Sequence, residues 1–185
     1  ETAAKRLDCW TALPLAVLAA GFLGAFMHLA SPLNAFGVFA GIGSSPLSNE
    51  ILVGVVFAAV AVVYWALALA GKLSSTLRKA LLVALAALAV VLAAFCGLAY
   101  MMYTIPTWNT PLSIVQMIGY LLAGGTVLGF CTVGFAQVGL PKGAGTVALA
   151  LTLVGVAVGT VGFGVQIAGL DAIRNIWSSA AELVP

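Results

Sequence analysis

The chain has 185 residues, of which 63% are hydrophobic and 6% charged, and its net charge is +2. Soluble domains carry about 25% charged residues, so this composition excludes a soluble globular protein, whose surface needs polar cover. We therefore expect a polytopic membrane protein whose surface is mostly in contact with lipid. The low net charge gives no basic surface to neutralise phosphates, so we expect no nucleic-acid partner.

Five stretches are long and apolar enough to cross a membrane, which takes about 20 residues. Barrel strands would be about ten residues long with alternating polarity, which this sequence lacks, so we predict helices. Pro14 lies near the start of the first helix, where its missing N–H costs little. The prediction is an all-α bundle in a single transmembrane domain, residues 1–185, with helices at 11–29, 50–70, 77–102, 112–138 and 145–167.

The basic residues predict how the helices are oriented in the membrane. If the five helices alternate in direction, one side of the membrane receives Lys5, Arg6, Lys72, Arg78, Lys79 and Lys142, whereas the other receives Arg174 alone. Cytoplasmic loops carry the excess of Lys and Arg, so the first side is predicted to be cytoplasmic. Residues 30–49, 103–111 and 169–185 would then lie on the outer face.

Two short segments on that outer face are predicted to lie along the membrane surface. Residues 31–40 begin with Ser31-Pro32, a helix-start signal, and place Leu33, Phe36 and Ala40 on one apolar stripe. Gly41-Ile-Gly43 should end this helix, and Ser45-Pro46 repeats the start signal just before the second membrane helix. Residues 170–183 mix charged and apolar side chains in a pattern typical of an interfacial helix.

The small residues have modest roles in this interpretation. Gly125 with Gly129, and Gly155 with Gly159, have the G-x-x-x-G spacing that lets two helices approach closely, so interior packing is predicted for both pairs. The cysteines are isolated, with no C-x-x-C spacing and no neighbouring His or acid. We therefore expect no metal site, no iron–sulfur cluster and no disulfide framework, and we interpret them as small apolar helix residues: Cys9, Cys96 and Cys131.

Polar residues concentrate between His28 and Glu50. His28 is the only histidine, at the outer end of the first helix, and Glu50 opens the second, so the helix–loop–helix return brings both to one face. Ionisable groups in or near a membrane are candidates for function. Simpler roles are also open: Glu50 could complement the positive end of its helix, worth about 0.3–1 kcal/mol, and His28 could hydrogen-bond a carbonyl. One histidine cannot supply the two axial ligands of a b-type haem, so we expect no haem.

Two stretches of this segment closely resemble the membrane anchor subunit of DMSO reductase: Met27-His-Leu-Ala-Ser-Pro-Leu-Asn-Ala-Phe36 and Ser44-Ser-Pro-Leu-Ser-Asn-Glu-Ile51. Ile105-Pro-Thr-Trp108 and Ser178-Ser-Ala-Ala-Glu-Leu-Val-Pro185 are also similar to that family, so the resemblance extends over nearly the whole chain. It implies an eight-helix, haem-free anchor that oxidises menaquinol in a prokaryotic cytoplasmic membrane during anaerobic respiration. It also implies two partners, an iron–sulfur subunit that takes the electrons and a molybdopterin subunit that reduces a sulfoxide or N-oxide. The five helices would be part of that anchor, and the start at Glu1 fits our expectation of a longer protein.

The resemblance also implies roles for individual residues. His28 and Glu50 match the family's histidine and acid and would bind quinol and accept its protons. The polar residues nearby, Ser31, Asn34 and Asn49, are our own candidates to orient it. Asn34 stands where a basic residue is expected in this family, and its amide cannot supply the charge of that residue. Two other functions are left open by the residues alone. A small transporter or channel subunit would have charged or broken helices near the midplane, which this sequence lacks, and a structural tether would hold an enzyme without binding quinol.

Overall fold

The computed structural model describes residues 2–27 and 32–170, and every regular element within them is helical. In chain order these are α1 (Ala3–Trp10), α2 (Ala12–Met27), the 3-10 helix η1 (Pro32–Gly41), α3 (Pro46–Leu69), α4 (Ser75–Tyr100), α5 (Leu112–Ala136) and α6 (Ala144–Ala168). Five helical segments are long and apolar enough to cross a membrane, with α1 and α2 together forming the first. The predicted all-α class and the five membrane helices are confirmed.

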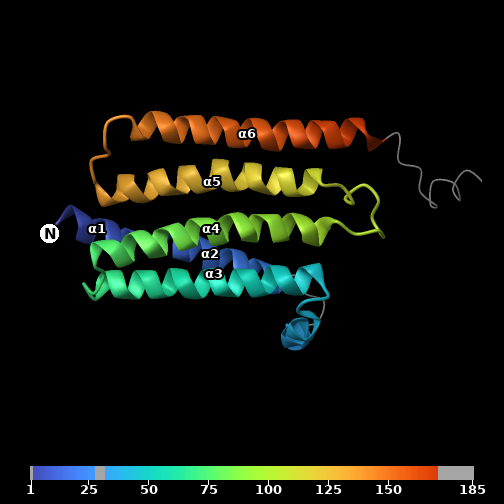
Figure 1. Ribbon diagram of the computed structural model, residues 1–185, viewed down its shortest axis with the longest axis horizontal. Helices are drawn as coiled ribbons and strands as arrows, with labels where there is room; N and C mark the ends of the chain where they lie inside the picture. Colours follow the sequence, from blue (N-terminus) through green and yellow to red (C-terminus); the bar gives the residue numbers. More distant parts are fainter. Residues whose placement is uncertain (1, 28–31, 171–185) are drawn as a thin grey trace, which may run out of the picture.

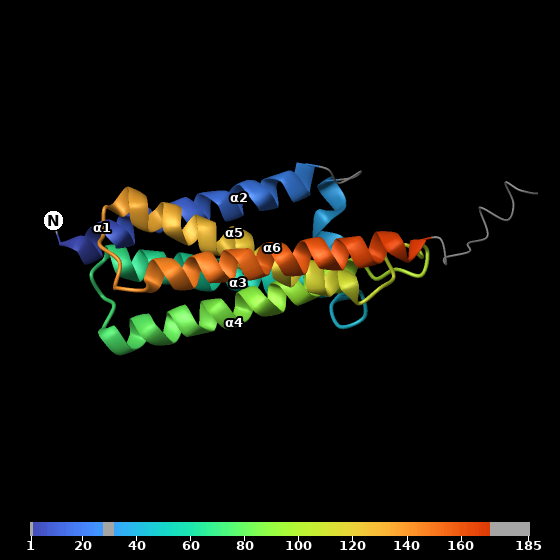
Figure 2. The same cartoon turned by 90° about the horizontal axis from the view of Figure 1, so that it is seen from above.

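The long helices run up and down as an antiparallel bundle. In Figure 1, α6, α5, α4 and α3 lie side by side in that order, and successive helices of this row make the most extensive contacts. Figure 2 shows α2 and α4 on opposite sides of the bundle, and α2 contacts α3 and α5. The segment before α1, the α3–α4 loop and the α5–α6 loop lie at one end of the bundle (Figure 1), so the described basic residues gather there, as predicted. We call this the basic end, and its assignment to the cytoplasm stays a prediction.

The outside of the bundle is apolar and its inside is built of small residues. Large side chains such as Leu23, Val83 and Val161 are exposed, whereas Ala68, Ala93 and Ala136 are buried. Lipid tails are as apolar as leucine, so burying large side chains brings no advantage over leaving them in lipid. Small residues instead let helix backbones approach and gain close van der Waals contact.

Close approach between α5 and α6 depends on glycine. A Cβ atom added to Gly119 would lie 2.6 Å from the backbone nitrogen of Gly159 and 2.8 Å from the carbonyl oxygen of Gly155. Interior packing of Gly155 and Gly159 is therefore confirmed, with α5 as their partner. For Gly125 and Gly129 the same prediction is wrong: both are exposed, and no other helix comes within 4 Å of a Cβ added there.

The helix ends differ from the predicted limits at two informative places. The first span begins at Ala3, not residue 11, and it is divided at Thr11. Pro14 lies three residues beyond this break and has no N–H to bond the carbonyl of Trp10, so it interrupts the helix instead of starting it. The second span begins at Pro46 instead of residue 50, because Ser45 caps it by accepting a hydrogen bond from the Ser48 N–H, 3.4 Å away.

A polar cluster closes the basic end of the bundle. Arg78 of α4 donates two hydrogen bonds to the buried Asp8 carboxylate of α1, one to Oδ1 and one of 2.9 Å to Oδ2. Arg78 also donates to the hydroxyl oxygen of Tyr64 on α3, 3.1 Å away. On the other side of α1, the rings of Trp10 and Phe135 stack at 5.0 Å. These contacts attach α1 directly to α4 and α5, and Arg78 links the same cluster to α3.

Candidate functional site

The end of the bundle opposite the basic end carries the residues singled out by the sequence. There α2 ends, η1 lies beside the start of α3, and α4 finishes close by (Figures 1 and 2). We call this the quinol end, after the activity that the resemblance implies. The chain turns through it between η1 and α3, and short polar side chains determine the shape of that turn.

The turn from Gly41 to Asn49 is held by its own hydrogen bonds. The Asn49 side-chain oxygen accepts a bond of 2.7 Å from the N–H of Gly43, whose φ of +86° is a conformation that favours glycine. The Ser44 hydroxyl donates to the Gly41 carbonyl at 3.0 Å. Asn49 therefore stabilises the turn through its oxygen, which leaves its NH₂ group as the part that could orient a ligand.

The predicted surface helix of residues 31–40 has a different form. Residues Pro32–Gly41 form a 3-10 helix, η1, which ends at Gly41 as expected. Side chains three apart share a face in a 3-10 helix, so Phe36 aligns with Phe39 and not with Ala40 as an α-helical stripe would require. Phe36 is 80% exposed and Phe39 is exposed as well, so η1 presents two aromatic rings to its surroundings.

Glu50 lies within the bundle, at the contact between α3 and α4. It is the fifth residue of α3, and its side chain is half-buried. The Cys96 thiol of α4 donates to its Oε1 atom, with Sγ 3.2 Å away. A helix dipole acts mainly within the first turn, so the helix start at Pro46 places Glu50 beyond the range where complementing the dipole explains its presence.

Glu50 also differs in its partner from the other carboxylate that the structure describes. Asp8 is paired with Arg78, whereas the polar contact of Glu50 is an uncharged thiol. One turn deeper in α3 the packing is close, because a Cβ added to Gly54 would lie 2.9 Å from the ring of Phe22 on α2. A half-buried acid without a described cation beside it is suited to accept a proton.

Of the other residues predicted for the quinol site, Asn49 is fully described by the structure and Asn34 only in its backbone. His28 and Ser31 lie outside the described residues. Asn34 lies on η1, and its side chain is outside the described part. The structure thus places Glu50 and Asn49 as consecutive residues of α3, with Met27, the last residue of α2, at the same end (Figure 2).

A second polar group at the quinol end was not predicted as a site. The Gln116 amide of α5 donates to Oε1 of Gln166 on α6 at 2.6 Å, and Gln166 donates in turn to the Thr107 carbonyl, also at 2.6 Å. Gln116 is buried, and these two bonds tie the α4–α5 loop to both helices. Each glutamine is visible in the sequence as a polar residue in or at the end of an apolar span, but nothing in their spacing of 50 residues shows that they meet.

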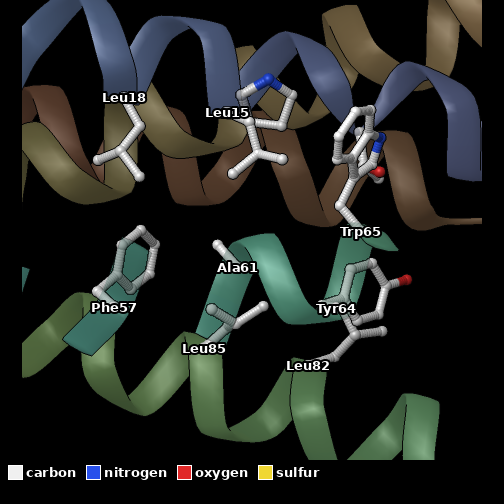
Figure 3. A pocket seen from close by; sticks show the side chains of 10 residues that line it. Leu15, Leu18, Phe57, Ala61, Tyr64, Trp65, Leu82 and Leu85 are labelled. Carbon is white, nitrogen blue, oxygen red and sulfur yellow. The ribbon is translucent and has the colours of Figure 1, made fainter. Parts of the chain in front are cut away.

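An apolar cavity of about 190 Å³ lies toward the basic end, between α2, α3 and α4 (Figure 3). Leu15 and Leu18 of α2 face Phe57 and Ala61 of α3 across it, and Tyr64, the Arg78 partner, borders it. It is remote from Glu50, which does not line it. Among the described residues no group of three His, Cys, Asp or Glu side chains is arranged to hold a metal ion.

Comparison with known proteins gives a consistent result. Residues 5–185 match the family model described as DMSO reductase anchor subunit (DmsC). The sequence is 34% identical over 172 residues to one subunit of the anaerobic dimethyl sulfoxide reductase of Escherichia coli, covering 89% of this protein and 57% of that subunit. It is 29% identical over 177 residues to the same-named subunit of Haemophilus influenzae, covering 92% and 61%.

A further relative is the anaerobic dimethyl sulfoxide reductase subunit YnfH of Escherichia coli, 34% identical over 122 residues, covering 66% of this protein and 43% of that one. The chain thus spans about half the length of the curated relatives it matches. No solved structure matches it.

Proposed function

The chain belongs to the family of DMSO reductase anchor subunits, and from this membership we propose that it oxidises menaquinol at the quinol end of its bundle. The electrons would pass to an iron–sulfur subunit, and from there to a molybdopterin subunit that reduces a sulfoxide or N-oxide. The membrane would be the cytoplasmic membrane of a prokaryote, with the quinol end on its outer face.

The observation that carries the proposal is the environment of Glu50. Quinol oxidation removes two protons, so the site needs two acceptors next to an apolar space for the quinol tail. Glu50 is half-buried between α3 and α4 with an uncharged partner, and the exposed apolar side chain of Leu47 lies one turn before it on α3. An ionised carboxylate there would accept a hydrogen bond from one quinol hydroxyl and then its proton.

His28 would act as the second acceptor. Histidine with an ordinary pKa near 6.5 can take a proton and release it to water near neutral pH. It follows Met27 directly, and α2 ends at that residue at the quinol end. Ser31, Asn34 and Asn49 would orient the ring, Asn49 through the NH₂ group that the turn leaves available.

The side chains proposed for the site accept protons and cannot carry away two electrons. An electron-accepting partner is therefore part of the proposal, and the iron–sulfur subunit would have to dock within electron-transfer distance of the quinol. The described cations gather at the basic end, at the opposite end of the bundle from Glu50.

Titration of the complete purified complex with a non-oxidisable quinol analogue tests the proposal. Binding should perturb the spectroscopic signal of the nearest iron–sulfur cluster, and Glu50→Gln should remove that response while reduction by an artificial soluble donor continues. A structural tether would give no response in the unsubstituted complex, and that outcome would refute the proposal.

A further inference from the structure

Cys96 of α4 contacts the Glu50 carboxylate of α3. Its Sγ lies 3.2 Å from Oε1, and this is the polar contact that the described structure gives the acid. Glu50 is the fifth residue of α3, and Cys96 is the fifth from the end of α4. In antiparallel neighbours these positions are at the same depth, about 6 Å inside the helix ends at 1.5 Å per residue.

Helix packing fixes the direction in which Cys96 points. The next residue, Gly97, is buried against α5, and a Cβ added there would lie 2.7 Å from the backbone nitrogen of Ile114. This approach restricts rotation of α4 about its axis, because rotation that removes Gly97 from the contact would bring a larger side chain against the α5 backbone. Cys96 is thereby held toward α3 and Glu50.

The two members of the pair differ in hydrogen-bonding capacity. An ionised carboxylate only accepts hydrogen bonds, and a thiol is a weak donor. A bond from the thiol to Oε1 restrains the carboxylate without neutralising it. The second oxygen, Oε2, receives no hydrogen bond from the described residues.

We propose that Cys96 is a positioning residue, whose S–H group holds Glu50 by Oε1 so that Oε2 faces a quinol hydroxyl. This inference rests on the proposed function. In the proton step the quinol O–H bond breaks and an O–H bond forms on Glu50, while the two electrons leave for the iron–sulfur subunit. The sulfur keeps its proton and its oxidation state throughout.

Quinol-driven turnover of the complete membrane-bound complex tests this role. Cys96→Ala should lower kcat for quinol by roughly three- to tenfold, the effect of one modest hydrogen bond, with a smaller change in KM. Cys96→Ser, which retains a donor, should restore most of the rate. The matched control is Cys131→Ala on the exposed face of α5, which should have no effect.

An artificial soluble donor reports assembly in the same preparations, since it bypasses the quinol site. The proposal is overturned if Cys96→Ala oxidises quinol at the unsubstituted rate, or if Cys96→Ser is impaired as much as Cys96→Ala. If Glu50→Gln itself retains full quinol oxidation, the proposed function fails. If Glu50→Gln is inactive and Cys96→Ala is normal, only the role of Cys96 fails.

Infrared spectroscopy gives a readout that needs no turnover. The difference between the spectra of the unsubstituted complex and the Cys96→Ala complex isolates the S–H stretching band of Cys96. Glu50→Gln should shift that band, because an amide oxygen is a weaker acceptor than a carboxylate, and Cys131→Ala should leave it in place. A band that Glu50→Gln does not move would refute the hydrogen bond and the proposal with it.

Discussion

Asp8 and Arg78 stand 70 residues apart and form a two-point ion pair that joins α1 to α4. The Asp8 side chain is 7% exposed and that of Arg78 is 30% exposed. The two terminal nitrogens of the Arg78 guanidinium each donate to a different oxygen of the Asp8 carboxylate. This bidentate geometry makes the pairing directional as well as electrostatic. The first membrane span consists of α1 and α2, and α2 has no buried residues. The attachment of this span to the rest of the bundle therefore depends largely on α1 and on the ion pair of Asp8.

Breaking the ion pair should loosen the first span. Asp8→Asn leaves a partly buried guanidinium without its counter-charge, and we expect a loss of about 1–3 kcal/mol, seen as a lower temperature of thermal unfolding in detergent. Lys79→Gln is the matched control, because it removes an exposed charge beside Arg78. Equal stability of the Asp8→Asn and Lys79→Gln variants would contradict the assigned role.

Replacing Gly119 or Gly125 of α5 by alanine should have different effects on stability. Gly119→Ala drives a Cβ atom into the α6 backbone, so we expect separation of α5 and α6 and a clear loss of stability, about 1–3 kcal/mol as for overpacking of a core. Gly125→Ala adds the same atom where no other helix lies near, and better helix propensity should make it neutral or slightly stabilising, by up to about 1 kcal/mol. Thermal unfolding of the two variants side by side decides the matter, and a Gly119→Ala protein as stable as Gly125→Ala would disprove the close α5–α6 contact.

Substitution at the proposed quinol acceptors should stop one half of the reaction. His28→Ala, Glu50→Lys and Glu50→Gln should each reduce quinol-driven sulfoxide or N-oxide reduction by roughly a hundredfold or more, the usual contribution of a proton acceptor. Reduction by an artificial donor should continue at the unsubstituted rate. Full quinol oxidation by the His28→Ala protein would remove that residue from the site.

The predicted orientation can be tested with single cysteines in a protein whose own three cysteines are replaced by serine. Tyr103 in the α4–α5 loop is 91% exposed, and Lys142 lies in the α5–α6 loop at the basic end. In spheroplasts, whose cytoplasmic membrane is intact and accessible, a thiol reagent that cannot cross membranes should label Tyr103→Cys. It should label Lys142→Cys only after the spheroplasts are lysed. The reverse pattern would invert the topology.

Removing the glutamine contact should weaken the quinol end. Gln116→Leu leaves Gln166 with one partner fewer, and hydrogen bonds between membrane helices contribute about 0.6–1.7 kcal/mol. The Gln116→Leu and Gln166→Leu effects on unfolding should be less than additive in the double variant, because the two side chains share one bond. Additive effects would show that the bond contributes nothing.

The membrane helices can be predicted from sequence because apolar length is a local property. Four of the five predicted spans agree with the structure to within about four residues at either end. The predicted start of α3 is late because Glu50 interrupts the apolar pattern, although Ser45-Pro46 is the signal at which the helix begins. Pro14 reads as a helix start in the sequence, whereas in the structure it is the reason for a break.

Contacts between helices are less predictable, because they depend on how each helix is rotated about its axis. Two G-x-x-x-G pairs look equivalent in the sequence, yet Gly155 and Gly159 meet a neighbour whereas Gly125 and Gly129 do not. Cys96 looks inert in the sequence because its partner, Glu50, is 46 residues away. Asp8 carries no signal there either, since only basic residues enter the orientation argument.

The distance in sequence between Asp8 and Arg78 also orders events in time. Ribosomes add roughly 5–20 residues per second, so Arg78 is made about 4–14 s after Asp8. The first span therefore enters the bilayer before the residue that will hold it exists. The ion pair can form only when α4 arrives, and until then the contacts available to α1 are those with α2 and α3, which are made earlier.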